Sequence, residues 1–280
     1  MKIKKTAGPI AISIFIITLI FTSATMTRAE SKSLLMATTT STDNTGLLDY
    51  LMPLFTEETG IEIKWTSTGT GKALALGGNC DVDVLLVHAP EAEKKYIADG
   101  FGKERTEIMY NDFVIIGPED DPAGIKGKTV AQALDIMRDK GALFASRGDD
   151  SGTHKKELGL WKSSGKPLPE KEAWYVQTGQ GMLATINITE ERRGHTMTDR
   201  GTYIKYQSQK SGRAPLKILI EGDGILINQY SVLTLDPDRC PKAKHDLAKQ
   251  LASWMAGENA QKLIKEFRLL GEILFFPNAK

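Results

Sequence analysis

Three times along the 280-residue chain, an apolar segment of strand length runs into a loop of hydroxyl residues and glycines that then opens a helical pattern. The loops read ATTTST at 37–42, WTSTGTGK at 65–72 and SRGDDSGT at 146–153. Because apolar strands alternate with helical patterns, the chain is expected to form an α/β fold with mostly parallel sheets. Each loop then lies at the carboxyl edge of a sheet, where open α/β folds bind their ligands.

The other elements follow from the spacing of apolar residues. Apolar residues three or four apart at 47–55 and 247–255 indicate two helices whose apolar faces belong to the core. The expected strands span residues 34–37, 61–65, 84–87, 113–116, 143–145, 216–220 and 225–235.

Two breaks in composition suggest a boundary between two lobes. The polar turn GPEDDP at 117–122 follows one apolar strand, and EGDG at 221–224 precedes another. A chain that leaves one lobe at the first break and returns at the second forms two lobes joined by two crossings, which is the layout of a hinge. The predicted organisation is a signal peptide over 1–29, lobe I over 30–116 plus 225–280, and lobe II over 117–224.

The N-terminus has the parts of a secretory signal peptide. Three lysines within the first five residues precede an apolar run at 10–21, and the small-x-small pattern TRA lies at 27–29. The run is shorter than the ~20 residues that a membrane span needs, so cleavage after Ala29 is predicted, with an uncleaved anchor as the alternative. No cysteine lies near this point for lipid attachment, and a freely diffusing periplasmic protein is expected.

The chain holds two cysteines, Cys80 and Cys240. In an oxidising compartment, two thiols more often form a disulfide than remain free. Neither lies in the CxxC or His-rich context that is typical of metal or redox sites. We therefore predict a Cys80–Cys240 disulfide, with two free thiols as the alternative.

The charge balance excludes recognition by a broad charged surface. The chain has 36 Lys and Arg against 35 Asp and Glu, a formal net charge of +1. The charged residues of the predicted signal peptide are all basic. No basic surface for nucleic acid is expected. Any anion that this protein binds must therefore be held by local geometry.

The three loops supply such a geometry. Helix starts present backbone N–H groups and the positive end of the helix dipole to an anion. Hydroxyl residues also serve as simple N-caps, but five consecutive ones at 38–42 exceed what a cap needs. Arg147 adds a planar fork that suits two oxygens at once. Mostly neutral donors with one full charge favour a small, compact oxyanion over a nucleotide.

Enzyme and metal sites are not indicated. The sequence GTGKA at 69–73 lacks the spacing of a nucleoside-triphosphate loop. Asp149, Ser151 and His154 have the residue types of a hydrolase triad, but neighbours this close rarely converge, and no GxSxG motif is present. The other histidines lack metal-ligand spacing. We predict a binding protein without a cofactor.

Several motifs together resemble the tungstate-binding components of bacterial ABC transporters. They are TTTS at 38–41, STGTG at 67–71, VHAP at 87–90, NDFVIIGP at 111–118 and SRGDDSGTHKKE at 146–157, and the resemblance covers nearly the whole mature chain. It implies a type II periplasmic-binding fold, in which two α/β lobes close around an oxyanion and deliver it to a membrane permease with its ATPase. A monomer is expected.

The resemblance also implies a set of ligand residues. The spacing of Arg147, Asp149, Ser151 and Thr153 is similar to the ligand loop of periplasmic phosphate-binding proteins, where the Asp orients the Arg. Asp149 is therefore expected to hold Arg147. Which member of each pair in the first two loops contacts the ligand stays open. The expected ligand-binding residues are Thr38, Thr39, Ser67, Thr68, Arg147, Ser151, Gly152 through its N–H, and Thr153.

One difference from the phosphate-binding proteins reduces the number of candidate anions. Phosphate near neutral pH keeps a proton, and its binders place a carboxylate at the strand end that here reads LLVHA at 85–89. Without that acid, we expect a fully deprotonated tetrahedral dianion, with tungstate first and molybdate second. The alternatives are a receptor for another oxyanion such as sulfate or phosphate, a phosphatase, and an adhesive surface protein.

Overall fold

The alternation of strands and helices expected from the sequence is present in the computed structural model, which describes Met1 and residues 32–280. The predicted signal peptide and its cleavage site lie outside the described residues. The described residues 32–280 belong to one compact unit, and the fold is that of this unit. None of the helices in residues 32–280 combines the length and apolar character that crossing a bilayer requires.

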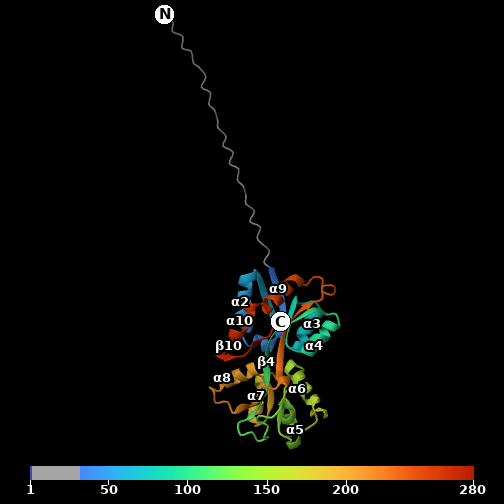
Figure 1. Cartoon of the computed structure of the whole chain (residues 1–280), viewed down its shortest axis with the longest axis vertical. Helices are drawn as coiled ribbons and strands as arrows, with labels where there is room; N and C mark the ends of the chain where they lie inside the picture. The colour runs from blue at the N-terminus through green and yellow to red at the C-terminus, as the bar shows by residue number, and fades with distance from the viewer. Residues whose placement is uncertain (2–31) are drawn as a thin grey trace. The chain divides into compact units, whose positions relative to one another are not determined.

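The elements follow one another in this order (Figure 1). The first half contains β1 (Lys32–Thr39), α1 (Thr40–Asp43), α2 (Leu47–Thr59), β2 (Ile61–Thr68), α3 (Thr70–Gly78), β3 (Val84–Val87), α4 (Pro90–Ala98), β4 (Gly102–Pro118), α5 (Val130–Lys140), β5 (Phe144–Ser146) and α6 (Gly152–Ser163). The second half contains β6 (Tyr175–Gln177), α7 (Met182–Glu191), β7 (Thr196–Asp199), α8 (Arg200–Gln209), β8 (Leu216–Ile220), the 3-10 turn η1 (Gly224–Leu226), β9 (Ile227–Leu235), α9 (His245–Ala256), α10 (Glu258–Glu266), β10 (Arg268–Leu269), β11 (Glu272–Ile273) and β12 (Phe276–Pro277).

The main sheet is mixed, so the expectation of mostly parallel sheets is wrong. β1 pairs in parallel with β2 and β3, because a helix connects each strand to the next. β9 pairs antiparallel with both β3 and β4, and β7, β8 and β12 also pair antiparallel with β4. The physical reason is that β4 carries the chain from one half of the unit to the other and β9 carries it back.

Successive residues of each strand point to opposite faces of the sheet, and this alternation separates the hydrophobic clusters. In β4, Phe113 and Ile115 pack with α5 and α6, whereas Val114 and Ile116 pack with α7 and α8. In the other half, one face packs against α2 and α9 and the opposite face against α3 and α4. Figure 1 shows the helices gathered at the two ends of β4 accordingly.

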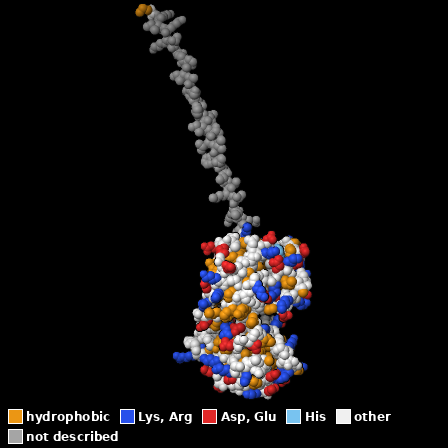
Figure 2. Space-filling model, in the orientation of Figure 1, with side chains coloured by type: hydrophobic (Ala, Val, Ile, Leu, Met, Phe, Trp, Pro, Cys, Tyr) orange, Lys and Arg blue, Asp and Glu red, His pale blue; other side chains and the backbone are white. Residues whose placement is uncertain are grey.

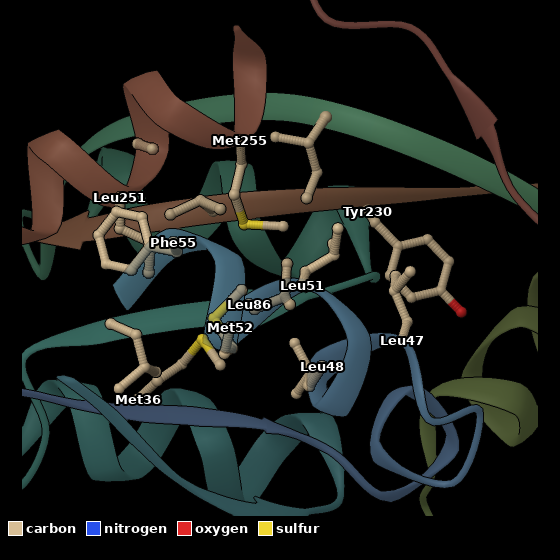
Figure 3. Packing of buried hydrophobic residues seen from close by; sticks show 14 of the residues in the cluster. Met36, Leu47, Leu48, Leu51, Met52, Phe55, Leu86, Tyr230, Leu251 and Met255 are labelled. Carbon is tan, nitrogen blue, oxygen red and sulfur yellow. The ribbon is translucent and has the colours of Figure 1, made fainter. Parts of the chain in front are cut away.

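The packing of α2 shows why an amphipathic pattern forms a helix here. Its buried residues lie three or four positions apart, so they share one face. Figure 3 shows residues of this face in one cluster with Leu251 and Met255 of α9, Met36 of β1 and Leu86 of β3. The buried residues of α2 are Leu47, Leu48, Leu51, Met52 and Phe55.

The clusters form two groups, the first packed against α2, α3, α4 and α9 and the second against α5 to α8. The chain passes from the first group to the second within β4, and back between η1 and β9. In β4, Met109 belongs to the first group and Phe113 to the second. On the return, Leu226 belongs to the second group and Tyr230, in β9, to the first. Both strands therefore connect the two packed halves. The lobe limits expected at 116/117 and 224/225 stay a prediction.

The short strands β6, β7, β10, β11 and β12 and the N-terminal part of β4 were not expected from the sequence. β6 and β7 are three and four residues long, which is too short for an apolar pattern to be recognised. The residues at 103–107 of β4 are polar and mostly exposed or partly exposed, because they pair with β9 on one side and precede Met109 and Tyr110, where β12 covers the other side.

The structure joins Cys80 and Cys240 in a disulfide, as predicted, between residues 160 positions apart. The bond connects the loop after α3 to the loop before α9. Cys240 is buried beside Leu235, whereas Cys80 is exposed.

Removing this disulfide is expected to destabilise the fold. A cross-link over a long loop restricts the unfolded chain, and its loss typically costs about 2–4 kcal/mol. The Cys80→Ala/Cys240→Ala variant should lose this amount of unfolding free energy in urea titrations, and wild type in reductant should lose the same. Equal unfolding free energies for oxidised wild type and the variant would contradict a stabilising role.

Candidate oxyanion-binding site

The three hydroxyl-rich loops lie around one cavity of about 470 Å³. β1 and β2 are parallel neighbours in which Thr39 pairs with Thr68, so the first two loops leave the sheet at the same edge. The third loop approaches from the other half of the unit: a Cβ atom on Gly152 would lie 3.0 Å from the Thr70 hydroxyl. The cavity is lined by Thr39, Thr40, Ser41, Thr68, Gly69, Thr70, Gly71, Lys72, His88, Arg147, Asp149, Asp150, Ser151, Gly152 and Thr153.

Two helices begin at this cavity. α3 has Gly69 as its N-cap and no side-chain cap, and the N–H of Ala73 is the first to bond back, to the Gly69 carbonyl. α6 has Ser151 as its N-cap, whose hydroxyl accepts the N–H of His154. The first N–H groups of a helix have no partner within it. Backbone donors such as those of Gly71 and Gly152 are therefore directed to the cavity end of each helix.

Arg147 is the cation that the loop itself positions. Its Nη2 donates to Asp149 Oδ2 at 2.5 Å, and Asp149 Oδ1 accepts the N–H of Ser151 at 3.2 Å. Its Nε is buried and has no hydrogen-bond partner among the described residues. A buried donor without a partner costs about 1–3 kcal/mol. An oxygen bound at this point would remove that cost.

Asp149 behaves as the residue that orients Arg147. Partial burial favours the neutral acid, but the hydrogen bonds from Ser151 and the positive charge of Arg147 outweigh it, so the pKa of Asp149 lies below its ordinary value. The carboxylate is therefore ionised at neutral pH and offsets the charge of the guanidinium.

The structure brings most of the predicted ligand residues together, but not all. Thr39, Thr68, Arg147 and the residues 151–153 line the cavity, with Asp149 beside them. Thr38 is fully buried, and its hydroxyl donates to the Leu86 carbonyl at 2.9 Å. Ser67 does not line the cavity either.

The hydroxyl of Ser67 donates to Asp43 Oδ2 at 2.8 Å. Thr38 and Ser67 lie opposite one another in the register of β1 and β2, one position before Thr39 and Thr68. Because neighbours along a strand point to opposite sides, the second member of each pair faces the cavity and the first does not.

Several cavity residues were not singled out from the sequence: Thr40, Ser41, Thr70, Lys72, His88 and Asp150. His88 directly follows β3, which pairs with β1 in the same sheet. The sequence could have indicated His88, because a residue that follows a third parallel strand reaches the same carboxyl edge of the sheet.

The charge available to an anion comes from a few side chains of the cavity wall and not from a broad charged surface. On the face shown in Figure 2, basic and acidic side chains are interspersed, with no broad basic area. Within the cavity wall, Lys72 and Arg147 are the cations, whereas Asp150 is paired with Lys155 at 2.9 Å. Residues 32–280 contain no cluster of three or more His, Cys, Asp or Glu side chains that could hold a metal ion.

A buried carboxylate supports the Arg147 loop from beneath. Glu157 Oε2 accepts a 2.6 Å hydrogen bond from Ser146 Oγ, which itself accepts the N–H of Gly148. Glu157 Oε1 accepts from the Tyr175 hydroxyl at 2.6 Å and from Trp161 Nε1 at 3.0 Å. Burial raises the pKa of Glu157 to about 7, although these hydrogen bonds act in the opposite direction.

This raised pKa makes stability depend on pH. The folded protein holds a proton on Glu157 that the unfolded chain releases above its ordinary pKa of 4.5. The stabilisation is full below that pH and is lost as pH rises through about 7. Between about pH 5 and about pH 8, wild type should therefore lose unfolding free energy relative to Glu157→Gln in urea titrations.

The exposed Glu119→Gln variant is the control and should follow wild type. The same pH slope for Glu157→Gln and wild type would contradict this role of Glu157.

Known proteins are similar to this chain over most of its length. The model of the PBP superfamily domain matches residues 26–259. The tungstate-binding protein TupA of Campylobacter jejuni is 47% identical over 240 residues, which cover 86% of this chain and 89% of the relative. TupA of Peptoclostridium acidaminophilum is 43% identical, with 88% and 86% covered.

A solved structure is similar over the same region. The tungstate-binding protein TupA from Desulfovibrio alaskensis G20 is 63% identical, with a TM-score of 0.84, covering 89% of this chain and 100% of that one. The type II periplasmic-binding fold expected from the sequence is confirmed by these matches. The chain belongs to the PBP superfamily and, within it, to the family of the TupA proteins.

Proposed function

We propose that this protein is the periplasmic receptor of an ABC importer and binds tungstate in the cavity between the three loops. The observation that carries the proposal is the buried Nε of Arg147, a donor without a partner among the described residues, at a cavity whose other donors, apart from Lys72, are neutral. The relatives named tungstate-binding proteins support this ligand.

The chemistry of the cavity favours a fully deprotonated oxyanion. An anion that leaves water must recover its hydrogen bonds, and hydroxyls and N–H groups from the three loops can donate to its oxygens. A protonated anion such as phosphate also needs an acceptor. Both carboxylates of the cavity wall, Asp149 and Asp150, are already paired with Arg147 and Lys155. Tungstate is therefore favoured, with molybdate second.

The ligand contacts proposed are Thr39, Thr68, Arg147, Ser151, Gly152 through its N–H, and Thr153, with Asp149 orienting Arg147. Because these groups come from both halves of the unit, an anion between them favours a closed arrangement of the halves. Such coupling would let a transporter distinguish the loaded receptor from the empty one.

The role is binding and not catalysis, as in the relatives that are named binding proteins. The solved Geobacter sulfurreducens relative, described as the tungstate ABC transporter and 47% identical with a TM-score of 0.73, supports a transporter partner. We further propose a membrane permease with its ATPase as that partner, action as a monomer without a cofactor, and export through a signal peptide cleaved after Ala29.

A competition titration tests the ligand. Isothermal titration of the purified protein with tungstate, molybdate, sulfate and phosphate should rank tungstate first, molybdate second and the other two far behind. A preference for sulfate or phosphate would assign the cavity to another oxyanion, and no heat with any of the four would contradict an anion receptor.

Arg147→Ala should weaken tungstate binding roughly a hundredfold or more, because a buried anion would lose its charged donor. The matched control is Arg193→Ala, since Arg193 also pairs with an aspartate, Asp120, but is exposed and does not line the cavity. The control should bind within about twofold of wild type. Equal losses for the two variants, measured by calorimetry, would refute the assignment of Arg147.

A further inference from the structure

A buried chain of polar side chains leads from the cavity to the two strands that connect the halves. His88 Nδ1 lies 2.9 Å from Asn228 Oδ1, and Asn228 Nδ2 donates to Asn111 Oδ1 at 2.7 Å. Both asparagine amides also reach the Tyr230 hydroxyl at 3.2 Å. All four side chains are buried, and Asn111 and Asn228 are paired in the register of β4 and β9.

These hydrogen bonds between buried side chains determine which nitrogen of His88 carries the proton. The amide N–H of Asn228 is used by the Asn111 carbonyl, so the oxygen of Asn228 faces the ring. An amide oxygen only accepts, and His88 Nδ1 must therefore donate. In the neutral ring, Nε2 is then left with a lone pair.

The lone pair of Nε2 faces two hydroxyls of the cavity wall. Nε2 lies 2.9 Å from Thr39 Oγ1 and 3.1 Å from Ser41 Oγ. While the ring is neutral, one of these hydroxyls must direct its hydrogen to Nε2 and cannot donate to an anion. If Nε2 carries a proton, it donates instead, and both hydroxyls can direct their hydrogens into the cavity.

The surroundings of His88 keep the ring neutral in the empty protein. Burial lowers the pKa of His88, while the hydrogen bond that His88 donates to Asn228 and the charge of Asp199 act in the opposite direction. The ring of Tyr230 stacks on it at 4.7 Å, and in Figure 3 the Tyr230 hydroxyl points out of the apolar cluster. His88 lines the anion cavity together with the charged groups of Lys72, Arg147, Asp149 and Asp150. It also lines a neighbouring cavity, whose charged groups are Glu91, Lys155 and Lys156.

A dianion in the cavity would change this balance. Two added negative charges close to the ring favour its charged form. We propose that tungstate binding protonates His88, whose Nε2–H then holds Thr39 and Ser41 with their hydroxyl hydrogens towards the anion. His88 is thus a positioning residue that acts through two hydroxyls, and the inference rests on the proposed function.

Proton uptake on binding predicts the direction in which tungstate affinity changes with pH. A proton bound with the ligand makes affinity rise as pH falls, until the empty protein is itself protonated at His88. The number of protons taken up per tungstate can be measured from the binding heat in buffers of different protonation enthalpy, such as Tris and HEPES, at about pH 7.5.

In this experiment wild type should take up a substantial fraction of a proton per tungstate. His88→Gln should take up none and bind roughly tenfold more weakly, because Gln cannot be charged but can still donate to the hydroxyls. His195→Gln is the matched control: His195 is also buried, with Nδ1 against the Leu143 carbonyl, and lies outside the cavity wall. It should keep the wild-type uptake.

Uptake that persists in His88→Gln would place the proton on another group, such as Glu157, and overturn the proposal. A second measurement needs no variant. The chain has four histidines, so the ring nitrogens of wild type can be followed by NMR during titration with tungstate. Both nitrogens of His88 should become protonated. An unchanged His88 ring in protein that binds tungstate would also overturn the proposal, whereas no binding at all would overturn the proposed function instead.

Discussion

An oxyanion in water is surrounded by hydrogen-bond donors, and a protein that takes it into a cavity must replace them. This requirement accounts for most features of the site. α3 and α6 both begin at the cavity, where their first N–H groups lack partners within the helix. Hydroxyl residues add neutral donors, and Arg147 adds one charge that Asp149 holds in place. Donors that are neutral and already oriented need little reorganisation when the anion arrives.

The sheet brings these donors to one place. β1, β2 and β3 are parallel and adjacent, so Thr39, Thr68 and His88 leave the same edge although up to 49 positions separate them. The Arg147 loop comes from the other half and is supported beneath by Glu157 through Ser146. A site divided between two halves can respond to its ligand by a change in their arrangement.

The two connecting strands, β4 and β9, join the site to both halves of the unit. β4 passes through both groups of hydrophobic clusters, and β9 begins directly after the last residue of the second group, Leu226. The two strands carry Asn111 and Asn228 between the groups. Buried polar groups are costly unless every partner is present. The hydrogen bonds that join these two asparagines to each other, to His88 and to Tyr230 therefore favour one arrangement of side chains at the point where the halves meet.

The sequence by itself determined the α/β class, the three loops at strand ends, the disulfide partners and the Arg147–Asp149 spacing, because each depends on local pattern or on a choice between few residues. Only the tertiary structure decided that β4 and β9 run antiparallel, that Thr39 and Thr68 rather than Thr38 and Ser67 face the cavity, and that His88 joins them. These outcomes depend on the register between strands far apart in the chain. A shift of one residue turns a side chain to the opposite side of a strand, and no local pattern records that register.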